Sequence, residues 1–384
     1  MKHIILLILL TIGVWAQDND CKYFGNTGYI LSPKSQSITL FDGCKTFVNF
    51  SDKGAKTIVA PSKVDNFSPI TATINASNVI VTSKKQGYIN SLNIENGESK
   101  LIVDLNLSTY DFLDTTPYVN ADGNRLLLKY YRDNKGDYIA LYNLINGEII
   151  FFEGNADQIY MNQRISVFAY SRFITEFKSN IFIYDDKSEV GVIDADSGLV
   201  YPVLSPNGKI LINKVFDFST RKFHLDAWDI ATNQKLYRID IGEAYVFGED
   251  FINNRQTHTN EMLLRLAKKI GIYEISTGKL IRELPELSKQ NIFGIAYLNE
   301  NTVITNDMRI WDIKNDKELL KLYIFENGEW VIVTPDGSFD SSDNGLKIFN
   351  QRLQDGKEQS RTLNLYDPKI VQQTLKSIMK WENN

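Results

Sequence analysis

Apolar and polar residues alternate along most of this chain, and the pattern returns at regular intervals. In residues 308–322 apolar side chains alternate up to Trp311 and Asp312, a polar turn follows, and a second apolar run comes after it. Alternation with a period of two on both sides of a turn predicts a β-hairpin. The pattern recurs in residues 225–239 and 270–284, so the chain is predicted to consist of repeated hairpins.

When the hairpins are aligned, a residue that accepts a positive φ angle falls at every turn. These residues are Gly43, Gly97, Gly147, Gly198, Asn233, Gly278 and Asp316. Their mean spacing is about 45 residues, which is the length of a four-stranded propeller blade. The sequence therefore predicts an all-β fold, a seven-bladed β-propeller, with six or eight blades as the alternatives.

A second set of polar residues lies four positions before the turns. After Thr39 in the first hairpin, each is a carboxylate or an amide: Asn93, Asn143, Asp194, Asp229, Glu274 and Asp312. Short polar side chains at the end of a strand accept hydrogen bonds from the turn backbone and fix the hairpin. We interpret this set as structural residues of the repeat turns and assign no catalytic role to it.

The first sixteen residues carry one lysine and an apolar run from Ile4 to Val14. Such a run is too short to cross a bilayer, which predicts a signal peptide at residues 1–16, cleaved after Ala16, with an uncleaved anchor as the alternative. In an exported chain Cys21 and Cys44, its two cysteines, are predicted to form a disulfide. Two buried free thiols are the alternative.

Two stretches depart from the repeat. Residues 53–73 contain Pro61 and Pro69 and are interpreted as a loop between the first two blades. The propeller is predicted to span residues 17–342, and residues 343–384 form a C-terminal extension.

The extension is predicted to end in a short helix at about residues 368–381, with Asp367 as its N-cap and Pro368 in its first turn. Apolar residues at helical spacing then fall on one face, which should pack on the body of the protein. They are Val371, Leu375, Ile378 and Met379.

The pairs Trp228-Asp229 and Trp311-Asp312, each followed by a turn and a returning strand, resemble the end of a WD40 repeat. Tyr273-Glu274 with the following turn is similar to a diverged copy. The resemblance covers residues 75–323 and implies a propeller of the WD40, YVTN or quinoprotein-like kind. The Gly-His pair typical of WD40 repeats is missing, because neither His224 nor His258 follows a glycine.

Residues 329–340, EWVIVTPDGSFD, are similar to a segment that follows bacterial WD40 propellers, in some cases ahead of a caspase-like domain. The activity of such a domain does not carry over, because no cysteine or histidine follows His258. The resemblance leaves one further function open, namely that this protein regulates a peptidase encoded by a separate gene.

Few sequence motifs indicate catalysis or the binding of a nucleic acid, a nucleotide or a metal. The net charge of −5 gives no basic excess for nucleic acid, and neither a P-loop nor a dinucleotide-binding glycine motif occurs. Asp336, Asp340 and Asp343 could offer oxygen ligands to Ca²⁺, but the EF-hand spacing is absent and turn chemistry explains them better. We therefore expect no catalytic residues, no metal site and no cofactor.

These features together predict an exported bacterial protein, periplasmic or secreted, that binds or scaffolds another protein of the envelope or the exterior without catalysing a reaction. No nucleic acid and no stable membrane insertion after signal cleavage are expected. The alternative is a propeller enzyme, or a protein that binds a sugar or cofactor in its central channel, which would need charged side chains from several blades to converge there.

Overall fold

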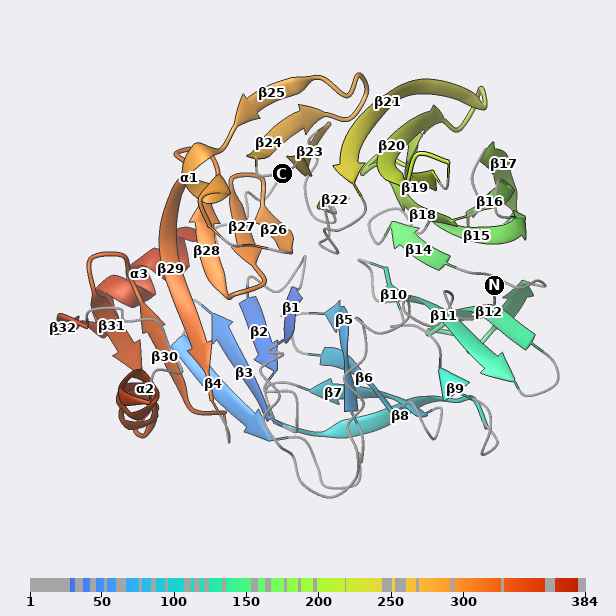
Figure 1. Ribbon diagram of the computed structural model, residues 1–384. Coiled ribbons are helices and arrows are strands. Elements are labelled where there is room, and N and C mark those ends of the chain that lie inside the picture. The colour runs from blue at the N-terminus through green and yellow to red at the C-terminus, as the bar shows by residue number, and fades with distance from the viewer. Residues whose placement is uncertain are drawn as a thin grey trace.

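The computed structural model describes residues 28–378, apart from connecting segments, of which the longest are 60–66, 244–250, 253–259 and 356–362. The described strands form seven sheets that follow one another along the chain and stand around a common centre (Figure 1). Within each sheet, strands that are consecutive in sequence pair antiparallel, as the hairpin pattern predicts; the exceptions are β9 in the third sheet and the parallel β32 in the last.

The strands of the first four sheets have the following bounds. The first sheet contains β1 Gly28–Leu31, β2 Ser37–Phe41, β3 Thr46–Ser51 and β4 Gly54–Val59. The second contains β5 Phe67–Asn75, β6 Asn78–Ser83, β7 Tyr88–Asn93 and β8 Ser99–Asp104. The third contains β9 Phe112–Leu113, β10 Tyr118–Val119, β11 Arg125–Arg132, β12 Gly136–Asn143 and β13 Ile149–Phe152. The fourth contains β14 Gln158–Asn162, β15 Val167–Thr175, β16 Lys178–Tyr184 and β17 Glu189–Ala195.

The three helices of the described chain come after strands of the remaining sheets. The fifth sheet contains β18 Leu199–Leu204, β19 Ile210–Asp217, β20 Lys222–Asp229 and β21 Gln234–Glu243. The sixth contains β22 Phe251–Ile252, β23 Glu261–Leu266, β24 Lys269–Glu274 and β25 Leu280–Glu283, followed by helix α1 Pro285–Ser288. The last contains β26 Ile295–Asn299, β27 Thr302–Thr305, β28 Arg309–Asp312, β29 Lys317–Ile324, β30 Trp330–Val333, β31 Ser338–Ser341 and β32 Leu365–Tyr366, with helices α2 Gly345–Gln354 and α3 Pro368–Ile378.

Apolar layers fill the spaces between neighbouring sheets. Because successive side chains of a strand point to opposite faces, β11 serves two layers at once. Its Leu126 and Leu128 pack with Ile89 of the preceding sheet, whereas Leu127 packs with Met161 of the following one. Similar layers join the fourth, fifth, sixth and last sheets, so the core consists of sheet-to-sheet contacts around the ring.

Two predictions about the repeat are wrong. Residues 53–73 are not a loop, because β4 and part of β5 lie within them; Pro69 is accommodated in β5, an edge strand, where the pairing register with β6 shifts. Gly43 and Gly198 lie outside the described residues, and the predicted hairpin around Gly198 is not formed, because β17 and β18 belong to different sheets. Helix α2, which the sequence did not predict, lies in the C-terminal extension.

The predicted C-terminal helix is present as α3. The carboxylate of Asp367 accepts hydrogen bonds from the backbone N–H groups of Lys369 and Ile370, both at 3.1 Å, and so caps the helix. Val371, Leu375 and Ile378 are buried on one face, as predicted, whereas Met379, the fourth predicted residue of that face, lies outside the described residues. None of the described helices is long and apolar enough to span a bilayer.

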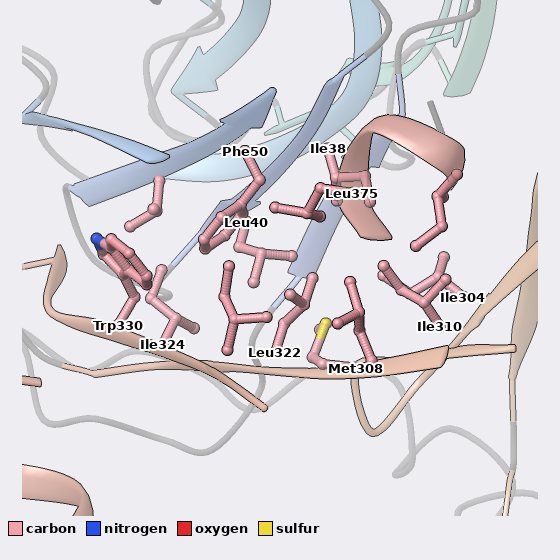
Figure 2. Packing of buried hydrophobic residues seen from close by; sticks show 14 of the residues in the cluster. Ile38, Leu40, Phe50, Ile304, Met308, Ile310, Leu322, Ile324, Trp330 and Leu375 are labelled. Atoms are coloured by element: carbon pink, nitrogen blue, oxygen red, sulfur yellow. The ribbon is translucent and has the colours of Figure 1, made fainter. Parts of the chain in front are cut away.

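Helix α3 packs where the first and last sheets meet. Figure 2 shows this cluster, with Ile38, Leu40 and Phe50 of the first sheet on one side and strand β29 with Leu322 on the other. The rings of Phe50 and Trp330 meet edge to face at 5.7 Å, and the side-chain amide of Asn299 donates to the carbonyl of Ile378 at 2.7 Å. Both ends of the described chain therefore contribute to closing the ring.

The turn between β29 and β30 lies against the first sheet as well, as the position of β4 beside these strands suggests (Figure 1). The hydroxyl of Thr57 donates to the carbonyl of Gly328 at 2.8 Å. Gly328 has a φ of +72°, and a Cβ atom there would collide with the methyl groups of Thr46 and Thr57. Only glycine fits both the backbone angle and the space.

We expect Gly328→Ala to lower the free energy of unfolding by about 2–4 kcal/mol, from left-handed backbone strain together with overpacking. Gly147→Ala is the matched control, because Gly147 has a φ of +75° but no atom within 4 Å of its Cβ position. This control should cost only about 1 kcal/mol. Urea denaturation of both variants measures the difference, and equal losses would show that contact with the first sheet is unimportant.

Candidate functional site

The predicted turn residues lie at the ends of strands, spread around the ring rather than gathered in one place. Asn93, Asn143, Asp229, Glu274 and Asp312 each end the third strand of the main path of their sheet. Four accept backbone hydrogen bonds from the turn, for example Asp229 from the N–H of Thr232 at 2.8 Å and Asp312 from that of Lys314 at 2.9 Å. Glu274 accepts from the hydroxyl of Thr277 at 2.5 Å. The turn residues of these hairpins have positive φ angles: Gly97, Gly147, Asn233, Gly278 and Asp316.

Asp194 differs from this set. It lies in β17, the last strand of its sheet, and pairs with Asn180 of β16. The hairpin turn of this sheet instead uses Asp185, whose carboxylate accepts from the N–H of Ser188 at 2.7 Å. The sequence alignment selected Asp194 because it too precedes a glycine by four residues, and spacing alone does not distinguish a hairpin from a connection between sheets. Residues 1–16, Cys21, Cys44 and His258 lie outside the described residues.

A buried polar group is present on one face of the fifth sheet. Cross-strand register places Asn213 of β19 opposite Asp226 of β20, and Asp226 opposite Arg238 of β21. Both oxygens of Asp226 bond to the guanidinium of Arg238, at 2.7 and 2.8 Å, and Lys235 lies 2.9 Å from the carboxylate. His224, two residues before Asp226, is buried 3.8 Å from the same carboxylate.

The charges of this group follow from its burial and its contacts. Burial acts to raise the pKa of Asp226, but the hydrogen bonds from Arg238 and Lys235 outweigh it and hold that pKa below its ordinary value. Burial lowers the pKa of His224, although the Asp226 carboxylate acts in the opposite direction. An anionic Asp226 beside two cations and a neutral His224 is therefore the expected state near pH 7.

The polar group comes from one sheet and faces the fourth sheet, since Leu211 and Val215 on the same face of β19 pack there. Asn213 is fully buried, and neither its amide oxygen nor its amide nitrogen has a hydrogen-bond partner in the described structure. Such a group commonly holds an ordered water. Within the described residues, no three His, Cys, Asp or Glu side chains gather closely enough to hold a metal ion.

Sequence reasoning missed this group, although a signal existed. In β20 the polar residues His224 and Asp226 alternate with Leu225 and Ala227, which face the other layer. Polar side chains at alternate positions of a strand buried on both faces indicate a polar contact within a core.

A second feature is an apolar surface on the third sheet. Four residues of the β12–β13 hairpin, which we call the β13 patch, are exposed: Ile145 (78%), Ile149 (41%), Ile150 (39%) and Phe151 (56%). The adjacent Phe152 turns inward and contacts Phe168 and Tyr184 of the fourth sheet, with ring centroids 5.0 and 4.9 Å apart. A rigid aromatic contact therefore holds the patch in place.

Comparison with known proteins identifies the fold. No protein-family model and no curated protein matches the sequence. Among solved structures, the chain resembles an uncharacterized Listeria monocytogenes EGD-e protein with a TM-score of 0.53 and 12% identity, over 77% of this chain and 94% of that one. It also resembles the Dos1 propeller, with a TM-score of 0.53 and 12% identity over 72% and 74% of the two chains. The fold is a β-propeller.

A third similar structure is KlHsv2 with loop 6CD replaced by a Gly-Ser linker, with a TM-score of 0.50 and 10% identity over 82% of this propeller and 96% of that chain. These structural similarities show the propeller fold, and at identities of 10–12% they show nothing more about the protein. The propeller fold agrees with what the Trp-Asp pairs implied, and a fold by itself does not give the function. What this propeller binds has to be argued from its own surface.

Proposed function

We propose that this protein is an exported, seven-bladed propeller that binds another protein of the cell envelope or exterior and catalyses no reaction. The observation that carries the proposal is the β13 patch. Four large apolar side chains of one short hairpin, in its turn and on both faces of β13, are exposed on a sheet that is otherwise well packed. Exposed groups of this kind mark protein-interaction sites more often than isolated surface leucines do.

The architecture supports this role. Apolar layers between sheets make the ring rigid, and a rigid scaffold lets the outer strands and loops present a fixed surface at little cost in conformational entropy. The seven sheets correspond to seven blades in this proposal, with the last blade enlarged by β30, β31 and β32. Export rests on the apolar segment of residues 4–14.

Two measurements test the proposal. The full-length chain with a C-terminal tag, produced in a bacterial host, is fractionated, and the intact mass of the exported form is determined; a mass that begins at Gln17 supports export and cleavage. Cross-linking in the envelope, followed by mass spectrometry and titration of the purified partner, tests binding. A tagged chain that keeps Met1 in the cytoplasm, or the absence of any partner that saturates it, would contradict the proposal.

A further inference from the structure

The buried polar group between the fourth and fifth sheets leaves several of its polar atoms without a hydrogen-bond partner. Asn213 is fully buried, and both atoms of its amide lack a partner in the described part of the chain. The same holds for Nε2 of His224, whose side chain is 7% exposed. An unpaired polar atom in a protein interior costs free energy, so most such atoms in folded proteins bond to the protein or to an ordered water.

The strand register brings these unpaired atoms close to one another. Asn213 of β19 lies opposite Asp226 of β20, so their Cβ atoms are about 5 Å apart. His224 lies two residues before Asp226 and therefore on the same face, diagonally across from Asn213 and within reach of it. Nε2 of His224 is 3.8 Å from Oδ2 of Asp226, which is too long for a hydrogen bond. A bridging water can close a polar gap of this length.

The charges of the group determine which ligand it can take. Asp226 accepts two bonds from Arg238 and lies 2.9 Å from the ammonium of Lys235. These three contacts leave one of the about four acceptor positions of a carboxylate free. A further anion would be repelled by Asp226, and a further cation by Lys235 and Arg238. The group therefore fits a neutral ligand that both donates and accepts hydrogen bonds.

The fourth sheet offers no alternative partner for the amide of Asn213. Apolar residues such as Ile181 and Ile193 fill most of the facing layer. Two serines of the fourth sheet are buried there as well, but Ser171 donates to the carbonyl of Val200, and Ser179 also has a partner. The bonds that Asn213 lacks must therefore come from a molecule that enters the layer.

We propose that one water molecule is held between the fourth and fifth blades, bonded to the amide of Asn213, to Nε2 of His224 and to Oδ2 of Asp226. Three partners are the usual number for a buried water. The water joins β19 to β20 through side chains and pairs the atoms that the protein leaves unpaired. It exchanges with solvent past Lys235 and Arg238, whose side chains are 30% and 44% exposed.

A crystal structure of the full chain, at a resolution that shows ordered water, tests the position. We expect a water peak within about 2.6–3.2 Å of all three atoms. Two outcomes would overturn the proposal. One is an Asn213 amide that bonds directly to a protein group, and the other is a His224 ring that has turned to bond directly to Asp226.

A measurement in solution tests whether this water is long-lived. Deuteron relaxation dispersion counts the waters that stay bound for longer than the protein tumbles. Asn213→Leu replaces the amide with two methyl groups, so about one such water should be lost. Asn350→Leu, on an exposed position of α2, is the matched control and should leave the count unchanged. An equal count in Asn213→Leu and wild type would contradict the proposal.

The unaltered protein gives the same answer if Asn213→Leu does not fold. With only asparagine side chains protonated and labelled with nitrogen-15, the NH₂ group of Asn213 should show a nuclear Overhauser effect to water of the sign that a long-lived contact gives. The absence of that effect would overturn the proposal whatever the variant does.

Discussion

Leu375→Ala is expected to lower the free energy of unfolding by about 2–5 kcal/mol, a large loss for one side chain on an 11-residue helix. Leu375 is 1% exposed and belongs to the cluster that joins the first and last blades. In a ring, these two blades are brought together only when the rest of the chain is in place. A cavity here therefore weakens the contact that completes the ring, as well as the docking of α3.

Two measurements distinguish this effect from a general loss of stability. Urea denaturation gives the magnitude, and Lys376→Ala on the exposed side of α3 is the matched control, which should change stability by less than about 0.5 kcal/mol. Hydrogen exchange gives the location: in Leu375→Ala, amides of β1 to β4 and β26 to β29 should exchange faster, while those of β15 and β16 keep their protection. Uniform acceleration in all blades would contradict a role in closure.

Replacing both Lys235 and Arg238 with methionine is expected to lower the free energy of unfolding by about 3–5 kcal/mol near neutral pH. The Asp226 side chain is 5% exposed and would remain buried without either cation. The loss comes from an uncompensated carboxylate rather than from missing attraction, since Lys235 and Arg238 are themselves 30% and 44% exposed. A single Arg238→Met substitution should cost less, because Lys235 stays 2.9 Å from the carboxylate.

The dependence on pH provides a separate test of this prediction. In the wild type the pKa of Asp226 lies below its ordinary value of 3.8, so its contribution is complete above that value and is lost only as the pH falls through the folded-state pKa. In the double variant, burial without cations raises the folded-state pKa above the unfolded one. The folded state then binds the proton more tightly, so the loss relative to wild type should shrink between about pH 7 and about pH 5.

An exposed ion pair serves as the control. Lys269 and Glu283 are also 2.8 Å apart, but their side chains are 70% and 45% exposed. Lys269→Met should therefore have no measurable effect on stability at either pH, since solvent screens the pair. If the double variant at Lys235 and Arg238 behaves like Lys269→Met, Asp226 is not held in a low-dielectric environment.

Local sequence patterns predicted much of the fold. The hairpins around Asn233, Gly278 and Asp316 were predictable because a turn with positive φ favours few residue types, and all three residues have the expected angle. Helix α3 was predictable because Asp367 is a good N-cap and Val371, Leu375 and Ile378 share a face. The function expected from the sequence, protein binding after export, stays a prediction.

Contacts between distant parts of the chain explain what the sequence analysis missed. Asp194 and Asp312 look alike in the sequence, yet only Asp312 closes a hairpin, since sheet membership depends on which strands pair. The group of Asn213, Asp226 and Arg238 arises from register across three strands, which local spacing does not give. The sequence analysis also missed the exposed edge of β13, because an apolar run such as IIFF typically indicates a buried strand.

Local sequence patterns were enough to predict the repeated hairpins, most of their turn residues and the amphipathic C-terminal helix, because each depends on interactions within a few residues. Contacts between distant parts of the chain bring the first and last blades together under α3 and bury a carboxylate between the fourth and fifth blades. They also leave β13, which carries no charge, at the outside of its sheet, where no described strand pairs with its outer side. Those features depend on which strands become neighbours, and that choice is made by packing and pairing over the whole ring.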